Sequence, residues 1–197
     1  MPDAPTSPQP DATLAQVDSF INRWQSAQAA EKSNGQLFLV ELAALIGATV
    51  PDPAVADTTR DAYVFERPVT YADGNRGIAD LYRRAHFVLE TKQGFDGKEE
   101  SSKRRKRKGH GKRGSSAWEA AMDAARAQVV RYAQNLEASE PVPPLAIVAD
   151  VGYCLDLYAD FGGSGRVYAP FPDAARKRIH LPDLRDPDVR ERLRLAF

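Results

Sequence analysis

The chain of 197 residues lacks the features that would assign it to several large protein classes. Its one cysteine, Cys154, cannot form an internal disulfide, which fits a reducing cytoplasm. Because Cys154 lies in the apolar pattern VGYCLDLY, we expect a small core residue rather than a nucleophile. No stretch reaches membrane-span length without a charge, and the first residues lack the basic and apolar regions of a signal peptide. We therefore expect a cytoplasmic protein with no membrane partner.

Common metal and nucleotide motifs are also missing. The three histidines, His86, His110 and His180, lie far apart in the sequence and do not have the spacing of metal ligands. There is no P-loop and no Rossmann glycine pattern. A zinc site built on histidine and cysteine, and the usual nucleotide-binding folds, are therefore not expected.

The charge is balanced overall, with 27 basic and 27 acidic residues, but it is unevenly distributed. Segment 103–113, KRRKRKGHGKR, holds eight basic residues and no acid, which leaves 19 basic against 27 acidic residues elsewhere. Such a segment can bind DNA phosphates without reading sequence, act as a nuclear localisation signal, or be a solvated loop. We favour DNA contact, because the segment follows the candidate site described next. The expected DNA-binding residues are Lys103, Arg104, Arg105, Lys106, Arg107, Lys108, Lys112 and Arg113.

The most informative pattern is an acidic residue facing an acid-x-lysine triplet across a short predicted hairpin. Asp80 ends GIAD, and Glu90 and Lys92 lie in FVLETKQ. Glu90 and Lys92 share one face of a strand, because side chains two apart point the same way. A turn centred on Ala85 would place Asp80 directly opposite Glu90, with Cβ atoms ~5 Å apart. A turn of even length would place them on opposite faces.

These residue types suit metal-dependent hydrolysis of a phosphodiester. Two carboxylates and a substrate phosphate can hold Mg²⁺, and Mn²⁺ is expected to substitute. Lys92 could orient the attacking water or offset charge on the phosphate. The alternative is that Glu90 and Lys92 belong to an ordinary solvated strand. Against it, Glu90 ends the apolar run 87–89, where an uncompensated carboxylate would be costly.

Two further features extend the candidate site. Glu41 is the only charged residue in the apolar stretch 36–51, so it needs a partner or a metal, unless it lies on the solvated side of a helix. Gln128 and Tyr132 are four residues apart on a predicted helix and therefore share a face. That face could contact Lys92 or the DNA, or the pair could be a packed tyrosine with a surface glutamine.

The order of predicted elements is helix, helix, three strands, helix and further strands. A mixed central sheet flanked by helices, an α/β fold, accommodates this order. Pro68 indicates an edge strand or a bulge, Ser116 and Glu119 form a capping box, and Asp186 with Pro187 begins the last helix. Helices are predicted over 12–30, 33–46, 116–136 and 183–197, and strands over 63–71, 77–83, 87–93, 145–151, 153–161 and around 165–168. The domain organisation is a flexible tail over 1–11 and one domain over 12–197, with a basic flexible loop over 97–115.

This order of elements with D…E-x-K resembles the PD-(D/E)XK nuclease core, the fold of restriction endonucleases. The resemblance implies a metal-binding role for Glu41, Asp80 and Glu90, and a catalytic role for Asp80, Glu90 and Lys92. Gln128 and Tyr132 match the Q-x-x-x-Y helix motif of RecB-like members and are implied as supporting catalytic residues.

A longer series of segments is similar to one family. FINRWQ, QLFLVELAALIG, YVFERPVT, DLYRRAHFVLETKQG, AWEAAMDAARAQVVRYA, DVGYCLDLYADF and YAPFPD resemble the N-terminal domain of MmeI-like enzymes. These are bacterial restriction-modification proteins that join an endonuclease to an adenine-specific DNA methyltransferase in one polypeptide. The resemblance implies a Mg²⁺-dependent endonuclease domain that acts on double-stranded DNA in the bacterial cytoplasm.

The sequence departs from this family in three respects, one of which is that the basic loop is an unusually dense version of a variable region. Ala79 occupies the proline position of the PD motif, and the chain ends at Phe197, in the terminal helix, where the family would continue. No Asn-Pro-Pro-aromatic tetrapeptide and no glycine-rich S-adenosylmethionine motif is present, so we expect no S-adenosylmethionine site. The alternatives are a partner-dependent DNA-binding subunit, completed by a methyltransferase and target-recognition subunit, or a decayed fragment.

Overall fold

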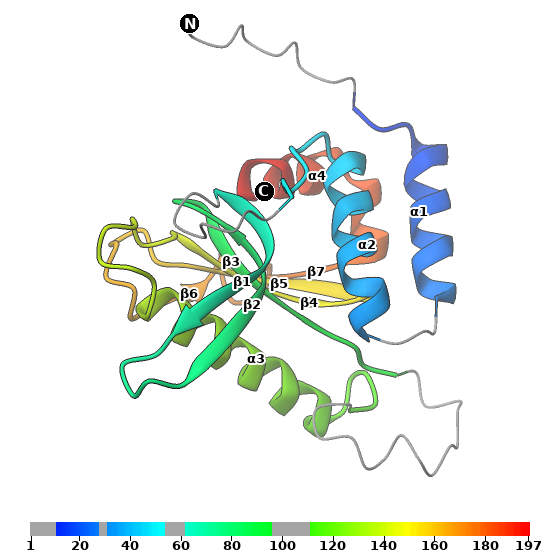
Figure 1. Cartoon of the computed structure of the whole chain (residues 1–197). Helices are drawn as coiled ribbons and strands as arrows, with labels where there is room; N and C mark the ends of the chain where they lie inside the picture. The colour runs from blue at the N-terminus through cyan, green and yellow to red at the C-terminus, as the bar shows by residue number, and fades with distance from the viewer. Residues whose placement is uncertain (1–10, 28–30, 54–61, 96–110) are drawn as a thin grey trace, which may run out of the picture.

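The computed structural model describes residues 11–27, 31–53, 62–95 and 111–197. Its centre is a seven-stranded mixed sheet with helices on both faces (Figure 1). The helices are α1 (Leu14–Ser26), α2 (Glu31–Leu45), α3 (Ser116–Gln134) and α4 (Pro187–Ala196), with a 3₁₀ helix, η2 (Leu181–Arg185), before α4. The strands are β1 (Tyr63–Thr70), β2 (Arg76–Arg83), β3 (Phe87–Lys92), β4 (Leu145–Asp150), β5 (Cys154–Ala159), β6 (Ala169–Pro170) and β7 (Arg178–His180).

The sheet has one parallel contact, between β3 and β4, and its other strand pairs are antiparallel. The strand order is β1-β2-β3-β4-β5-β6, and β7 also pairs with β5. Parallel neighbours need a crossover connection, and α3 lies in the connection between β3 and β4. The predicted α/β class, a mixed sheet flanked by helices, is therefore confirmed.

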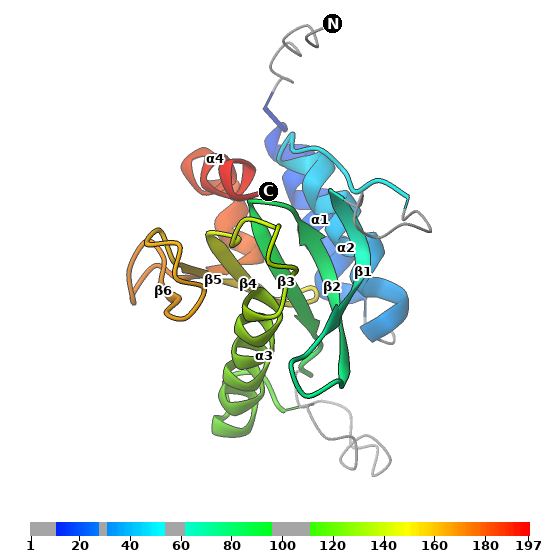
Figure 2. The same ribbon diagram turned by 60° about the vertical axis from the view of Figure 1, so that its left-hand side comes forward.

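Helices α1, α2 and α4 lie on one side of the sheet and α3 on the other (Figure 2), and each side has its own apolar core. The α2-side core joins the sheet to α1, α2 and α4, and the α3-side core joins it to α3. On β4, Ile147 faces the α2-side core and Val148 the α3-side core, so the strand is buried along its whole length. A strand covered on both faces has a continuous apolar sequence, which explains why LAIVA has no polar alternation.

The hairpin of β2 and β3 has the predicted register. Leu81 pairs with Leu89 and Arg83 with Phe87, so the turn is centred on Ala85. Ala85 has a φ of 61°, the left-handed conformation that closes a three-residue hairpin turn. Residue 80 therefore lies one step beyond the last pair, opposite residue 90.

Several element boundaries differ from the prediction. The helix cap before α3 is Ser115, whose hydroxyl accepts a hydrogen bond from the Trp118 amide, so the predicted cap at Ser116 is wrong by one residue. The strand expected around 165–168 is also wrong, because β6 begins at Ala169, and the pattern did not predict β7. The predicted edge position of Pro68 and the helix start at Asp186 and Pro187 are confirmed.

A tight turn between β4 and β5 fixes α1 against the sheet. Gly152 has a φ of +78°, and a Cβ atom there would lie 2.4 Å from the Trp24 carbonyl oxygen. Gly163 has a similar φ of +67°, but a Cβ atom there would meet nothing within 4 Å. The two glycines share the backbone requirement and differ in steric environment.

We expect Gly152→Ala to lower the free energy of unfolding by at least about 1 kcal/mol more than Gly163→Ala does. Both variants add left-handed strain, but only the first forces α1 away from the turn. Urea unfolding of the two variants measures this difference. Equal losses would show that the contact with Trp24 does not constrain α1.

Candidate active site

The sheet forks next to the hairpin. Within the described strands, the β2–β3 ladder ends at the pair Leu81 and Leu89, while β2 continues alongside β1 back to Arg76. Beyond Leu89, β3 continues alongside β4 as far as Lys92. The two central strands therefore separate, and residues 80 and 90 lie where they part.

Asp80 lies at the apex of this fork and bonds to the edge of β3. Its Oδ2 atom accepts hydrogen bonds from the Thr91 amide, at 2.7 Å, and from the Thr91 hydroxyl, at 2.5 Å. The amide would otherwise seek a backbone carbonyl on a neighbouring strand. The carboxylate therefore takes the place of the missing backbone acceptor. It is held at Thr91, the residue that follows Glu90 in the sequence.

An irregularity in β1 and β2 directs Asp80 to this position. Ala79 packs in the α3-side core and Leu81 in the α2-side core, although residues two apart on a regular strand share a face. Across from Asp80, Glu66 of β1 has a φ of 55°, in the left-handed region. The pleat changes sides at this step, so Asp80 points at the edge of β3 instead of into either core.

Glu90 and Lys92 form an ion pair on the α3 side of β3. The Lys92 Nζ atom lies 2.7 Å from Glu90 Oε1, as expected for residues that share a strand face. Only 7% of the Glu90 side chain and 20% of the Lys92 side chain are exposed. An ordinary solvated strand is therefore excluded, because the carboxylate is buried and its charge is compensated locally.

Tyr132 of α3 lies near Glu90, and Gln128 of the same helix bonds to Tyr132. Gln128 Nε2 donates to the Tyr132 hydroxyl at 2.5 Å, and Tyr132 is buried. Burial and then the nearby charge of Glu90 raise the pKa of Tyr132 above its ordinary value, while the Gln128 bond acts against them. The phenol therefore stays protonated at neutral pH and lies close enough to Glu90 to sense its charge.

Comparison with protein-family models shows to which family this chain belongs. The family model described as MmeI, N-terminal domain, matches residues 12–196. The chain belongs to this family. Comparisons with curated proteins and with solved structures found no match. Membership associates this MmeI N-terminal domain with restriction-modification proteins, which act on DNA.

Glu41 bonds to two residues of α1 in this MmeI N-terminal domain. Its Oε2 atom accepts a hydrogen bond from Trp24 Nε1 at 2.8 Å, and its Oε1 atom lies 3.1 Å from the Arg23 guanidinium. Among the described residues, no three acidic, histidine or cysteine side chains are grouped as metal ligands. The polar partners of Glu41 therefore lie on α1, and Glu41 joins α1 to α2.

The expected DNA-binding residues divide into two groups. Residues 103–108 lie outside the described residues, and Lys112 is exposed. The Arg113 guanidinium donates to the Asp150 carboxylate, at 3.1 Å from Nε and 2.9 Å from Nη2, and to the Val151 carbonyl. Arg113 is therefore used inside the fold.

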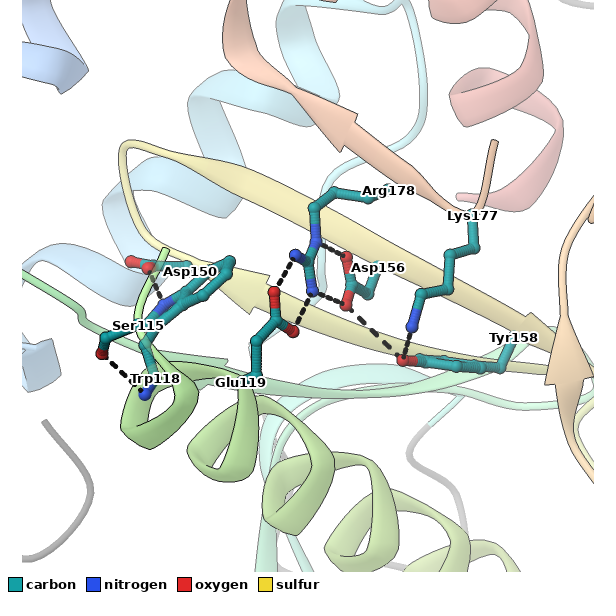
Figure 3. A network of polar contacts seen from close by, with 8 residues as sticks. All are labelled: Ser115, Trp118, Glu119, Asp150, Asp156, Tyr158, Lys177 and Arg178. Carbon is teal, nitrogen blue, oxygen red and sulfur yellow. Dashed lines mark hydrogen bonds and ion pairs between the residues drawn. The ribbon is translucent and has the colours of Figure 1, made fainter. Parts of the chain in front are cut away.

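Asp150 is a structural centre that the sequence analysis missed. It is fully buried at the end of β4, opposite Lys92 in the parallel register. Besides Arg113, it accepts a hydrogen bond from the Gly94 amide. It also accepts one from Trp118 Nε1, which Figure 3 shows. It therefore joins the end of β3 to the start of α3. The only signal in the sequence is an acid directly after the apolar run LAIVA.

A second network holds the same helix to β5 and β7. Arg178 donates to Asp156 at 2.7 Å from Nε and to Glu119 at 2.7 Å from Nη1, which joins three elements (Figure 3).

Cys154 lies in the α3-side core, where burial raises the pKa of its thiol above the ordinary value. The thiol therefore stays neutral, as expected for a core residue.

In the described part of the chain, no helix has the length and apolar character needed to cross a membrane.

We expect Asp150→Asn to lower the free energy of unfolding by about 3 kcal/mol, because it leaves a mostly buried guanidinium without its counter-charge. Asp173→Asn is the matched control, since Asp173 pairs with Arg176 on the surface. Asp173→Asn should lower the free energy of unfolding by less than about 1 kcal/mol. Urea unfolding of both variants tests the difference, and a small loss for Asp150→Asn would contradict its role.

Proposed function

We propose that this chain is the Mg²⁺-dependent DNA endonuclease domain of a restriction-modification protein, and that it hydrolyses phosphodiester bonds. The observation that carries the proposal is the fork, where Asp80 lies beside a buried Glu90–Lys92 ion pair. A fork that separates two strands gives acidic side chains on adjacent strands access to one site. The fold alone would permit many functions, and these three side chains are what favour this one.

The donor atoms suit Mg²⁺, which prefers carboxylate oxygens, water and phosphate. Both Thr91 hydrogen bonds fall on Asp80 Oδ2, and within the described residues Oδ1 accepts none. Asp80 and Glu90 would hold the metal, and water and a substrate phosphate would complete its ligands. When bound, Mg²⁺ supplies a polarised phosphoryl oxygen and a more acidic water. Mn²⁺ is expected to substitute for it.

Lys92 supplies the positive charge of the site. Its ammonium has three N–H donors, and one of them points to Glu90 at 2.7 Å. Another can hold the attacking water or a non-bridging phosphoryl oxygen. The water oxygen attacks phosphorus and loses a proton, the bond from phosphorus to the 3′-oxygen breaks, and that oxygen gains a proton. The products are a 5′-phosphate and a 3′-hydroxyl.

Gln128 and Tyr132 act on this centre from α3. Because Tyr132 is buried and close to Glu90, its position limits how far the glutamate can move. The hydrogen bond from Gln128 orients the tyrosine hydroxyl in turn. We propose that the two residues keep Glu90 and Lys92 in place and do not exchange protons with the substrate.

The end of the basic segment bonds to the chain just after β3. The Phe95 amide donates to the Gly111 carbonyl, and the Arg113 amide donates to the Phe95 carbonyl. These bonds join Phe95, three residues beyond Lys92, to Gly111 and Arg113 at the end of the segment. We propose that the basic residues 103–108 and Lys112 bind DNA backbone phosphates next to the site.

We expect Lys92→Ala and Asp80→Ala to reduce cleavage of supercoiled plasmid in Mg²⁺ by at least about 100-fold, because each removes charge that acts on the phosphoryl group. Removing the metal with EDTA should abolish cleavage, and Mn²⁺ should restore it. Lys177→Ala is the control, since the Lys177 ammonium bonds to the Tyr158 hydroxyl at β5. Cleavage by Lys92→Ala at the wild-type rate would refute the assignment.

Absence of cleavage by the wild-type chain has a separate meaning if the chain still binds the metal. It would indicate a DNA-binding subunit that needs a methyltransferase and target-recognition partner. Adding such a partner should then restore cleavage by the wild type and not by Lys92→Ala.

We expect replacement of the basic residues at 103–107 by glutamine to weaken DNA binding and to flatten its dependence on salt. Each lost phosphate contact should reduce the slope of log K against log salt by about 0.9. Fluorescence anisotropy over a series of salt concentrations measures the slope. An unchanged slope would show that the segment does not contact DNA.

A further inference from the structure

The outer end of the β1–β2 hairpin is docked on the last turn of α3. The Ala72 amide donates to Asn135 Oδ1 at 3.2 Å, and Asn135 Nδ2 donates back to the Arg131 carbonyl at 2.8 Å. Inside the turn, the Asn75 amide donates to Asp73 Oδ1 at 2.9 Å. The hairpin end and the helix end therefore hold a fixed position relative to each other.

A three-layer stack lies on this junction. The Arg131 guanidinium carbon is 3.7 Å from the centre of the Tyr71 ring. The Tyr71 and Tyr132 rings are nearly parallel, with centroids 6.2 Å apart and an interplanar angle of 5°. We call Arg131, Tyr71 and Tyr132 the stack.

Gly77 of β2 makes room for the stack. A Cβ atom at Gly77 would lie 2.2 Å from the Tyr71 hydroxyl oxygen and 2.5 Å from Tyr132 Cε1. Gly77 belongs to the part of β2 that has separated from β3. The stack therefore lies against the β2 arm of the fork, on the face that also carries Glu90.

The stack extends from the buried site to the solvent. Tyr132 is buried and senses the charge of Glu90, Tyr71 is half-buried, and 51% of the Arg131 side chain is exposed. Arg131 pairs with Asp73, which is also 51% exposed, at 3.2 Å. Exposed pairs of this kind contribute little stability, so a competing anion can replace the aspartate at little cost.

We propose that Arg131, supported by the Tyr71 ring, binds a backbone phosphate of the DNA strand that enters the fork, and that DNA displaces Asp73 from it. This inference rests on the proposed nuclease function and names a contact for its substrate. Arginine suits this role because its planar group matches two phosphate oxygens at once. The ring below it restricts the side chain before DNA arrives, which reduces the entropy lost on binding.

A purely structural role makes a different prediction. If Arg131 and Asp73 only fasten the hairpin to α3, removal of either charge weakens the junction and DNA affinity falls or stays the same. If Asp73 competes with DNA for Arg131, removal of its charge raises DNA affinity. Asn at position 73 can still accept the Asn75 amide, so Asp73→Asn preserves the turn while removing the charge.

The experiment is fluorescence anisotropy of a labelled DNA duplex titrated with the full chain, in Ca²⁺ to prevent cleavage, over a series of KCl concentrations. We expect Arg131→Gln to weaken binding about tenfold and to reduce the salt slope by about 0.9, the value for one phosphate contact. Asp73→Asn should bind more tightly than the wild type. Arg194→Gln is the matched control, because Arg194 and Glu191 form a similarly exposed pair on α4, and it should bind as the wild type does.

The outcomes separate this inference from the nuclease proposal. Wild-type affinity and slope for Arg131→Gln, or weaker binding by Asp73→Asn with a lower melting temperature, would overturn the phosphate contact alone. No binding by the wild type would overturn both proposals. A reduced slope for Arg131→Gln, in a chain that does not cleave with Mg²⁺ present, would support the contact while contradicting the nuclease.

Discussion

The hydrogen bond from the Thr91 amide to Asp80 is the interaction on which the candidate site depends. The two central strands part beyond Leu81 and Leu89, and a buried amide left without an acceptor would cost about 1–3 kcal/mol. Asp80 satisfies that amide with one carboxylate oxygen and keeps its charge at the fork. One side chain therefore stabilises the sheet where it opens and supplies a ligand there. Asparagine at position 80 can still accept the hydrogen bond from Thr91 but carries no charge. Asp80→Asn therefore separates the role in the sheet from the role as a ligand.

The α3 side of the sheet carries acids on three adjacent strands, and each has a basic partner. Glu90 pairs with Lys92, Asp150 with Arg113 and Asp156 with Arg178, with closest contacts between 2.7 and 2.9 Å. Buried charges are tolerated when they are paired and hydrogen-bonded in this way. Two of the pairs also hold the start of α3, while Asn135 holds its end. The helix is therefore fixed at both ends, which makes it a rigid support for Gln128 and Tyr132.

The parts of the structure that could be predicted depend on local patterns. The hairpin register followed from the odd turn centred on Ala85, and Asp80 lies one step beyond its last pair, Leu81 and Leu89, where it bonds to Thr91. The contacts of Glu41 and Arg113 could not be predicted, because each depends on a residue brought close by the fold, Trp24 and Asp150 respectively. An isolated charge in an apolar segment indicates that a partner exists without indicating which one. Strand β7 was missed because three residues give too short a pattern, and the metal-binding and catalytic roles at the fork stay predictions.

Metal binding is the first property to measure at the fork, because it does not require cleavage, a partner or a particular DNA sequence. Titration of the full chain with Mn²⁺, followed by electron paramagnetic resonance of the free ion, compares wild type with Asp80→Asn and Glu41→Gln. We expect Asp80→Asn to lose the binding site and remain folded, while Glu41→Gln binds Mn²⁺ as the wild type does. Full binding by Asp80→Asn, or loss of binding in Glu41→Gln alone, would contradict a metal site at the fork.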